Sequence, residues 1–257
     1  MRAVVAHGAG DFRLEDVPDP TLEGGAVVRM EAAGVCAADR MIYKGDSPWE
    51  LTFPFVPGHE NVGTIVELDA EAGQRWGVAE GDMVVNEVMV PCGDCPLCRR
   101  ERFHLCRNGR HIGSSLPGGW AERMAIPPKA RVWRVPAGLA AEEAVVAEPL
   151  ACGIHAVERA DPREGETVVI SGIGAIGAGA LAYVAAVKPA AEIVALVTTP
   201  ERAAIARELG AAAAIDVTAT DAAAELRDRT DGVGPDHYLD FTGVTASVDL
   251  ALSLIHI

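Results

Sequence analysis

Basic residues are scarce in this sequence relative to acidic ones. The 257 residues include 22 Lys and Arg against 37 Asp and Glu, which gives a net charge of −15. A surface with this excess of negative charge repels phosphate backbones and anionic lipid headgroups. We therefore expect neither nucleic acid nor a membrane surface among the partners.

Long apolar runs are also missing. The first residues, MRAVVAHGAG, alternate in polarity and do not form the apolar core of a signal peptide. No stretch of about 18 apolar residues suggests a membrane span. Hydrophobic residues still make up 49% of the chain, enough for one large core or two smaller ones. The pattern predicts a cytoplasmic globular protein whose thiols stay reduced.

Cysteine is infrequent, yet four of the six cysteines lie in one short segment, VPCGDCPLCRRERFHLC. The spacing C-x2-C-x2-C-x7-C, on a loop with Gly and Pro, lets four thiolates reach one tetrahedral ion. The segment predicts a structural zinc held by Cys92, Cys95, Cys98 and Cys106. An iron–sulfur cluster is the alternative, although in bacterial ferredoxins the fourth Cys follows sooner and precedes Pro.

A second set of ligand-type residues is spread along the first half of the chain. Cys36, His59 and Glu148 are the residue types of a catalytic zinc that keeps one position open for water or substrate. Asp39 follows Cys36 by three residues and is expected to hold the other ring nitrogen of His59.

The second half has a different pattern. The strand-like run TVVIS leads into Gly172, Gly174 and Gly177, which form G-x-G-x-x-G before an Ala-rich helical pattern. Between a strand and a helix this spacing is the dinucleotide-binding fingerprint, in which glycines let a pyrophosphate approach the helix N-terminus. Four parallel strands are predicted in this half: Thr167–Ser171, Glu192–Val197, Ala213–Val217 and His237–Phe241.

Together these motifs resemble the zinc-dependent medium-chain dehydrogenases, the family of alcohol, sorbitol and threonine dehydrogenases. The resemblance rests on the four-Cys segment, GHE at 58–60, GD at 81–82, EPLA at 148–151 and the glycine fingerprint, in that order. It implies an α/β protein with a GroES-like β-rich catalytic domain, residues 1–155, and a Rossmann dinucleotide-binding domain, residues 156–251. The doubly wound parallel sheet of the second domain is expected to be incomplete, because strands five and six are absent.

The resemblance also implies roles for individual residues. Cys36, His59 and Glu148 match the ligands of a catalytic zinc, and Glu60 matches an acid that contacts bound water or exchanges as a ligand. The four clustered cysteines match the ligands of a second, structural zinc, so two zinc ions per chain are expected. The segments GVCAADRMIYKGDSPW and EPLACGIHAVERA are most similar to erythritol/L-threitol dehydrogenases, which oxidise short polyols.

The expected chemistry is hydride transfer from the carbon of a zinc-bound hydroxyl to a nicotinamide. Ala38 and Met41 stand where many relatives carry a proton relay. We therefore expect the proton to leave through water near Glu60, with Tyr43 as a further candidate. Trp49 and Phe55 are candidates for the substrate pocket wall, with core packing as the alternative.

The cofactor preference is read from the end of the second strand, LVTTPER. Val197 occupies the place where an NAD enzyme carries an acid for the ribose 2′-hydroxyl. The neighbouring Thr198, Thr199 and Arg202 are suited to a 2′-phosphate, which favours NADP over NAD, with use of both as the alternative. Ile176 in the glycine turn and Thr242 after the fourth strand complete the expected cofactor site.

The resemblance further implies a small alcohol or polyol substrate and a homodimer or homotetramer for the full-length enzyme. A threonine-type or other alcohol dehydrogenase is one alternative, and an inactive zinc-binding fragment is another. The last residues, 252–257 (LSLIHI), match one reading of a sequencing-library adapter. We expect a C-terminally truncated chain with an artefactual tail, and the alternative is a natural short protein whose sheet is completed by a partner.

Overall fold

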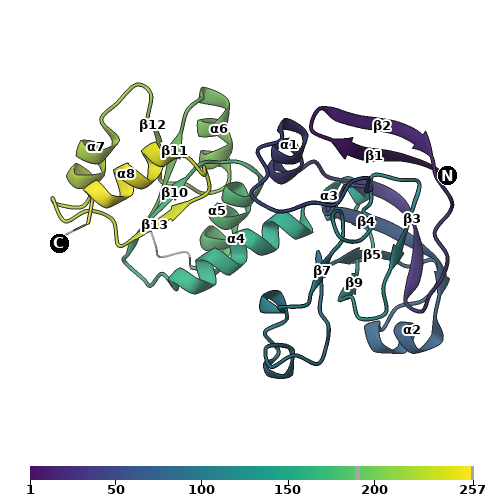
Figure 1. Ribbon diagram of the computed structural model, residues 1–257. Helices are drawn as coiled ribbons and strands as arrows, with labels where there is room; N and C mark the ends of the chain where they lie inside the picture. Colours follow the sequence, from purple (N-terminus) through teal and green to yellow (C-terminus); the bar gives the residue numbers. More distant parts are fainter. Residues whose placement is uncertain (189–191, 256–257) are drawn as a thin grey trace. The chain divides into compact units, whose positions relative to one another are not determined.

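The computed structural model describes residues 1–188 and 192–255. The chain divides into two compact units, Met1–Glu148 and Pro149–Ile257 (Figure 1). The expected boundary after residue 155 falls within helix α4, Ala147–Ala160. No helix in the described ranges is long and apolar enough to cross a membrane.

The first unit is built on a five-stranded sheet whose paired strands are all antiparallel, in the order β8-β3-β4-β5-β9. Inward-facing Val, Ile and Met side chains of these strands form its core, which includes Val28, Ile65 and Met124. The strands are β3 (Ala26–Ala33), β4 (Asn61–Leu68), β5 (Met83–Asn86), β8 (Arg123–Ile126) and β9 (Val132–Arg134).

Smaller elements surround this sheet. Two antiparallel ladders, β1 with β2 and β6 with β7, complete the β-rich unit. The four-Cys segment runs between β6 and β7 and contains two 3-10 turns, η1 and η2. The bounds are β1 (Arg2–Gly8), β2 (Asp11–Asp16), β6 (Met89–Val90), β7 (Arg110–His111), α1 (Ala37–Lys44), α2 (Ala70–Trp76), η1 (Cys98–Arg100), η2 (Phe103–Leu105) and α3 (Ala141–Ala144).

The second unit is a four-stranded parallel sheet in the order β12-β11-β10-β13. The strands are β10 (Thr167–Ser171), β11 (Glu192–Val197), β12 (Ala213–Asp216) and β13 (His237–Asp240), and the helices that follow them are α5 (Ala175–Val187), α6 (Pro200–Glu208), α7 (Ala222–Arg229) and α8 (Thr245–Ser253). This is the 3-2-1-4 part of a Rossmann sheet. The predicted α/β class is therefore confirmed.

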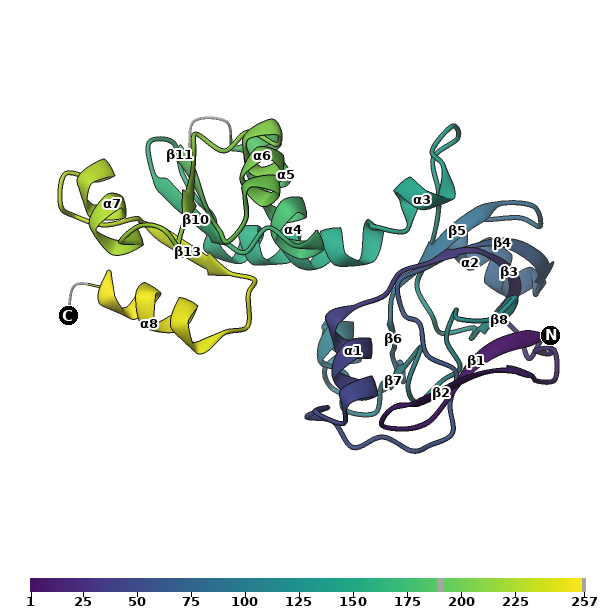
Figure 2. The ribbon, with the colours of Figure 1, turned by 90° about the horizontal axis from the view of Figure 1, so that it is seen from above.

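Burial on both faces explains the continuous apolar strands of this sheet. All five residues of β10 are buried. Val168 and Ile170 pack with α5 on one face, while Val169 packs with α7 on the other (Figure 2). Strands covered on both faces need apolar side chains in both directions, so their sequence does not alternate.

The predicted strand ends differ from the structure by one residue in two cases. The third strand ends at Asp216, not Val217, and the fourth at Asp240, not Phe241. In the tail, Leu252 and Ser253 belong to α8 and Leu254 is buried against β12 and α7. The expectation of an adapter tail falls partly on residues 256–257, which lie outside the described residues.

Candidate active site and metal centres

Cys36, His59 and Glu60 come together because β3 and β4 are antiparallel neighbours. Ala33 at the end of β3 pairs with Asn61 at the start of β4. The chain just after β3 therefore lies beside the chain just before β4. One ligand atom of each of these three residues lies within 4.8 Å of the others. A soft thiolate, an imidazole and a carboxylate at this separation suit a zinc ion.

Asp39 supports this cluster from within α1. One carboxylate oxygen, Oδ2, accepts the backbone N–H of Cys36 at 2.8 Å. The other, Oδ1, lies 3.7 Å from Nδ1 of His59 and is buried without a hydrogen bond. Burial raises the pKa of the Asp39 carboxyl, against the opposing effects of the Cys36 amide and His59. A metal on the other ring nitrogen of His59 would leave Nδ1–H for this carboxylate, so the residues fit the ion.

The charges around Cys36 also fit a bound metal ion. Burial raises the pKa of its thiol, and the negative charges of Glu60, Asp39 and Glu148 raise it further. A divalent cation among these groups would reverse the balance, because thiolates bound to a metal are deprotonated. Glu148 lies at the start of α4, and its negative charge acts on the Cys36 thiol. Its carboxylate is not part of the Cys36–His59–Glu60 group, whose ligand atoms lie within 4.8 Å of one another.

A cavity of about 700 Å³ opens beside His59 in the first unit. Trp49 lines it, whereas Phe55 is buried in a core cluster with Ala6 and Ile42. Tyr43 is not among the lining residues, and its ring lies edge-on to Phe12 at 5.3 Å. The polar side chains of the lining are Glu50, Thr52, His59, His111, Ser114 and Ser115.

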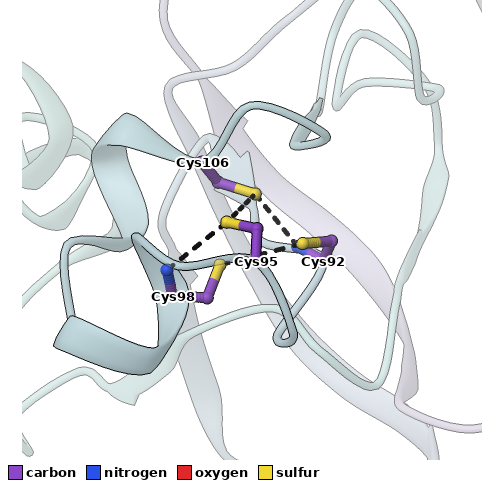
Figure 3. Close-up of side chains that lie close together, drawn as sticks. All are labelled: Cys92, Cys95, Cys98 and Cys106. Atoms are coloured by element: carbon purple, nitrogen blue, oxygen red, sulfur yellow. Dashed lines mark hydrogen bonds between the residues drawn. The ribbon is translucent and has the colours of Figure 1, made fainter.

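The four clustered cysteines point their sulfurs toward one another (Figure 3). All four Sγ atoms lie within 4.8 Å of each other, and two pairs, Cys92–Cys98 and Cys95–Cys106, are separated by 3.9 Å. Four sulfurs at about 2.3 Å from one tetrahedral zinc would lie about 3.8 Å apart. The distances fit one ion and leave little room for the several irons of a cluster.

Backbone amides lower the pKa of the Cys95 and Cys106 thiols, whereas the Asp94 carboxylate raises the pKa of Cys92 and burial raises that of Cys98. The N–H of Cys98 donates to Sγ of Cys95 at 3.4 Å, and such bonds lower the pKa of Cys95 to about 6. Arg131 lies over the rings of Phe103 and Trp133, at 5.3 and 5.2 Å from their centroids. These cation–π contacts fasten the four-Cys segment to strand β9.

The three glycines of the fingerprint have separate structural reasons. Gly172 makes the turn after β10 with φ +89°, a conformation that residues with a side chain rarely adopt. A Cβ at Gly177 would lie 1.9 Å from the Gly172 carbonyl oxygen, so this glycine allows α5 to approach the strand. Gly174 has nothing within 4 Å of the Cβ position, which leaves space for a ligand against its backbone.

A second cavity, of about 560 Å³, lies at this turn. Gly172, Gly174, Thr198, Arg202 and Thr242 line it, as the sequence predicts. Three other predicted residues do not line it: Ile176 and Gly177 follow the turn within α5, and the hydroxyl of Thr199 caps α6 by accepting the Arg202 amide.

Arg202 is held close to the glycine turn. Its Nη1 donates to the carbonyl of Ile173 at 2.7 Å. Val197 at the end of β11 also lines the cavity, where an acid for the ribose would stand. Asp221, a lining residue that the sequence did not indicate, accepts the Ala224 amide as the cap of α7.

A buried hydroxyl network beside the same cavity was missed from the sequence. Ser247 Oγ lies 2.8 Å from Ser171 Oγ and 3.0 Å from Tyr238 OH, and it donates to Asp240 at 2.7 Å. Burial acts to raise the pKa of Asp240, but hydrogen bonds from Thr242 and Ser247 outweigh it and lower the pKa. The sequence feature that could have indicated this network is Ser171, a polar residue at the end of a buried strand.

Comparison with known proteins identifies the family. A profile for the alcohol dehydrogenase GroES-like domain matches residues 23–137, and one for zinc-binding dehydrogenases matches residues 175–257. The erythritol/L-threitol dehydrogenase of Mycolicibacterium smegmatis is 41% identical over 99% of this chain and 73% of its own length. The chain belongs to the zinc-dependent medium-chain dehydrogenases.

Other medium-chain dehydrogenases are similar over the same span. The L-threonine 3-dehydrogenase of Pyrococcus abyssi is 31% identical, over 99% of this chain and 72% of that protein. The crystal structure of the alcohol dehydrogenase of Aeropyrum pernix has a TM-score of 0.89 and 31% identity, covering 99% of this chain and 76% of that one. The matched families and relatives are zinc-binding alcohol, polyol and threonine dehydrogenases, which are oxidoreductases, so the predicted reaction class is confirmed at the level of the family.

Proposed function

We propose that this chain oxidises a secondary hydroxyl of a short polyol with NADP, at a zinc held by Cys36, His59 and a carboxylate. The observation that carries the proposal is the Cys36–His59–Glu60 group, within 4.8 Å, with His59 on the wall of a 700 Å³ cavity. A zinc ion held by these residues would lower the pKa of a substrate hydroxyl group bound to it.

Two carboxylates compete for the third ligand position. Glu60 has the closer oxygen, and Glu148 is near enough to act on the Cys36 thiol. We assign Glu148 as the resting ligand, by resemblance to the family, and Glu60 as the group that exchanges with it. Asp39 orients His59 through Nδ1.

The proton is proposed to leave through water held by Glu60. Glu60→Gln keeps the shape of the side chain but removes its charge and its capacity to accept a proton. We expect kcat to fall at least tenfold, in line with a lost proton-transfer group, and its pH profile to shift. Full turnover with an unchanged profile would show that the route lies elsewhere.

The polar lining of the cavity supports a polyol over a simple alcohol. Glu50, Thr52, His111, Ser114 and Ser115 supply donors and acceptors for further hydroxyl groups. The apolar wall formed by Ile42, Trp49 and Leu51 suits the carbon chain. The erythritol/L-threitol dehydrogenase relative favours a four-carbon polyol over threonine.

NADP is proposed from the end of β11. Val197 offers no acceptor for a ribose hydroxyl, while Thr198 and Arg202 present a hydroxyl and a guanidinium to the second cavity. A guanidinium binds phosphate through two parallel N–H bonds. Two zinc ions per chain, a homodimer or homotetramer and a cytoplasmic location complete the proposal.

The test is a substrate panel measured with each cofactor. Erythritol, L-threitol, L-threonine and ethanol are compared by kcat/KM, first with NADP and then with NAD. The proposal expects the tetritols to lead and NADP to exceed NAD. Faster oxidation of threonine would favour the threonine-type alternative, and equal kcat/KM for the two cofactors would defeat the NADP preference.

A further inference from the structure

A glycine directly after β3, Gly34, leaves the space that the Glu60 carboxylate occupies. A Cβ built on Gly34 would lie 1.9 Å from Oε2 of Glu60, 3.0 Å from its Cδ and 2.9 Å from its Cβ. These separations are far below van der Waals contact, so no other residue fits while Glu60 keeps its position. The carboxylate lies directly against the Gly34 Cα.

The requirement at Gly34 is steric and not conformational. Gly34 is not among the glycines with positive φ, so its backbone is open to any residue. By contrast, Gly58, just before His59, has φ +97°. Glycine is therefore needed at position 34 for the space it leaves to Glu60, and not for its own backbone conformation.

The backbone of Gly34 is tied on both sides. Its N–H donates to the Glu60 carbonyl at 2.8 Å, and its own carbonyl accepts the indole N–H of Trp120 at 2.9 Å. Trp120 is itself fixed by its backbone N–H to the Pro57 carbonyl at 3.0 Å. Because Gly34 is held, the Glu60 side chain would have to move instead: its carboxylate would turn away, and its Cβ, 2.9 Å from the added methyl group, would have to shift slightly.

We propose that Gly34 is a positioning residue, which keeps the Glu60 carboxylate within ligand distance of Cys36 and His59. The inference rests on the proposed metal site and deepens it, because it explains why Glu60 is the carboxylate found in the group. A methyl group at position 34 would turn Glu60 out of the group while leaving every proposed ligand in the sequence.

The experiment measures metal binding and needs no substrate. Wild type, Gly34→Ala, Glu60→Ala and the double variant are purified, stripped of zinc and titrated with Co²⁺, recording affinity and the visible spectrum. The four-Cys site has no carboxylate and serves as an internal reference. Gly8→Ala, at a β1 position with nothing within 4 Å of the Cβ, is the matched control.

We expect Gly34→Ala and Glu60→Ala to weaken cobalt binding at the Cys36–His59 site by a similar factor, roughly ten- to hundredfold. Both should give the same altered spectrum, and the double variant should be no worse than Glu60→Ala alone. The thiolate spectrum of the four-Cys site should be unchanged throughout.

Two results would overturn the inference. One is a wild-type affinity and spectrum for Gly34→Ala. The other is a double variant whose defect is the product of the two single defects, because Gly34 would then act without Glu60. If Gly34→Ala fails to fold, the Gly34→Ala/Glu60→Gly double variant decides, because it removes both the carboxylate and the Cβ of Glu60. Recovery supports a clash with the Glu60 side chain, and failure contradicts it. A lack of dehydrogenase activity would leave this readout intact.

Discussion

At the scale of single residues, Arg202 carries the proposed cofactor preference. Its guanidinium is already held against the glycine turn by the Ile173 carbonyl, so little side-chain freedom remains to be lost when a phosphate binds. Hydrogen bonds to a charged group contribute about 1.5–3 kcal/mol, and about 1.4 kcal/mol corresponds to tenfold in affinity.

Arg202→Ala is therefore expected to lower kcat/KM for NADP by about tenfold or more while leaving that for NAD nearly unchanged. Steady-state kinetics with both cofactors give the comparison. Arg207→Ala is the matched control, because Arg207 lies on the same helix but does not line the cavity. An equal loss with both cofactors would place Arg202 in the turn as a structural residue only.

At the scale of elements, two glycines of one turn should respond differently to the same change. Gly177→Ala brings a methyl group 1.9 Å from the Gly172 carbonyl oxygen and should destabilise the fold by about 1–3 kcal/mol. Gly174→Ala enters open space, so it should leave Tm near the wild-type value and raise the KM of the cofactor. Thermal unfolding and cofactor kinetics on both variants separate the effects. A Gly174→Ala variant with unchanged cofactor KM would contradict the assignment.

A hydrogen bond joins His237, at the start of β13, to Glu166, directly before β10. Nε2 of His237 lies 2.8 Å from Glu166, which precedes β10, and this bond, with the Arg163 amide, lowers the pKa of Glu166. A carboxyl with a lowered folded pKa stabilises the fold fully above its unfolded pKa of about 4.3, and this contribution is lost as pH falls through the lower folded value.

Glu166→Gln should consequently cost stability at pH 7 and progressively less below about pH 4. Urea unfolding across this pH range measures the difference from wild type. Glu164→Gln, an exposed neighbour, is the control and should show no such convergence. A Glu166→Gln difference that stays constant with pH would mean that the charge of the Glu166 carboxylate does not contribute to stability.

At the scale of the whole molecule, the number of zinc ions per chain is the quantity to measure. The two ligand groups are separate in sequence and share no residue. Cys98→Ser should therefore reduce the metal content from two zinc ions to one and lower Tm, because a structural zinc contributes directly to folding. Elemental analysis of the purified proteins gives the count. A wild-type content of one zinc would contradict the two-site proposal.

Sequence reasoning reached the α/β class and the four parallel strands, which follow from apolar runs and a glycine fingerprint. Thiol spacing indicated the four-Cys group, whereas the strand order and the role of Glu60 were implied by resemblance to the family. Glu148, expected as a ligand, is not part of the Cys36–His59–Glu60 group. The space beside Gly34 and the Ser171–Ser247–Tyr238–Asp240 network depend on segments distant in sequence. No local pattern marks such contacts. The caps formed by Thr199 and Asp221, by contrast, are local features, because Thr or Asp directly before a helical run, with Pro at the first helical position after Thr199, marks a helix start.

The ladder between β6 and β7 has a consequence for how this protein can change. Met89 pairs with His111 and Val90 with Arg110, so the whole four-Cys segment leaves and re-enters the unit at one point. A single deletion could remove it and a short turn could close the gap, which makes the segment a removable cassette. His111 at its exit also lines the cavity beside His59. Gain, loss or redesign of the cassette would thus be an evolutionary and engineering route to reshaping the pocket wall while the underlying sheet stays the same.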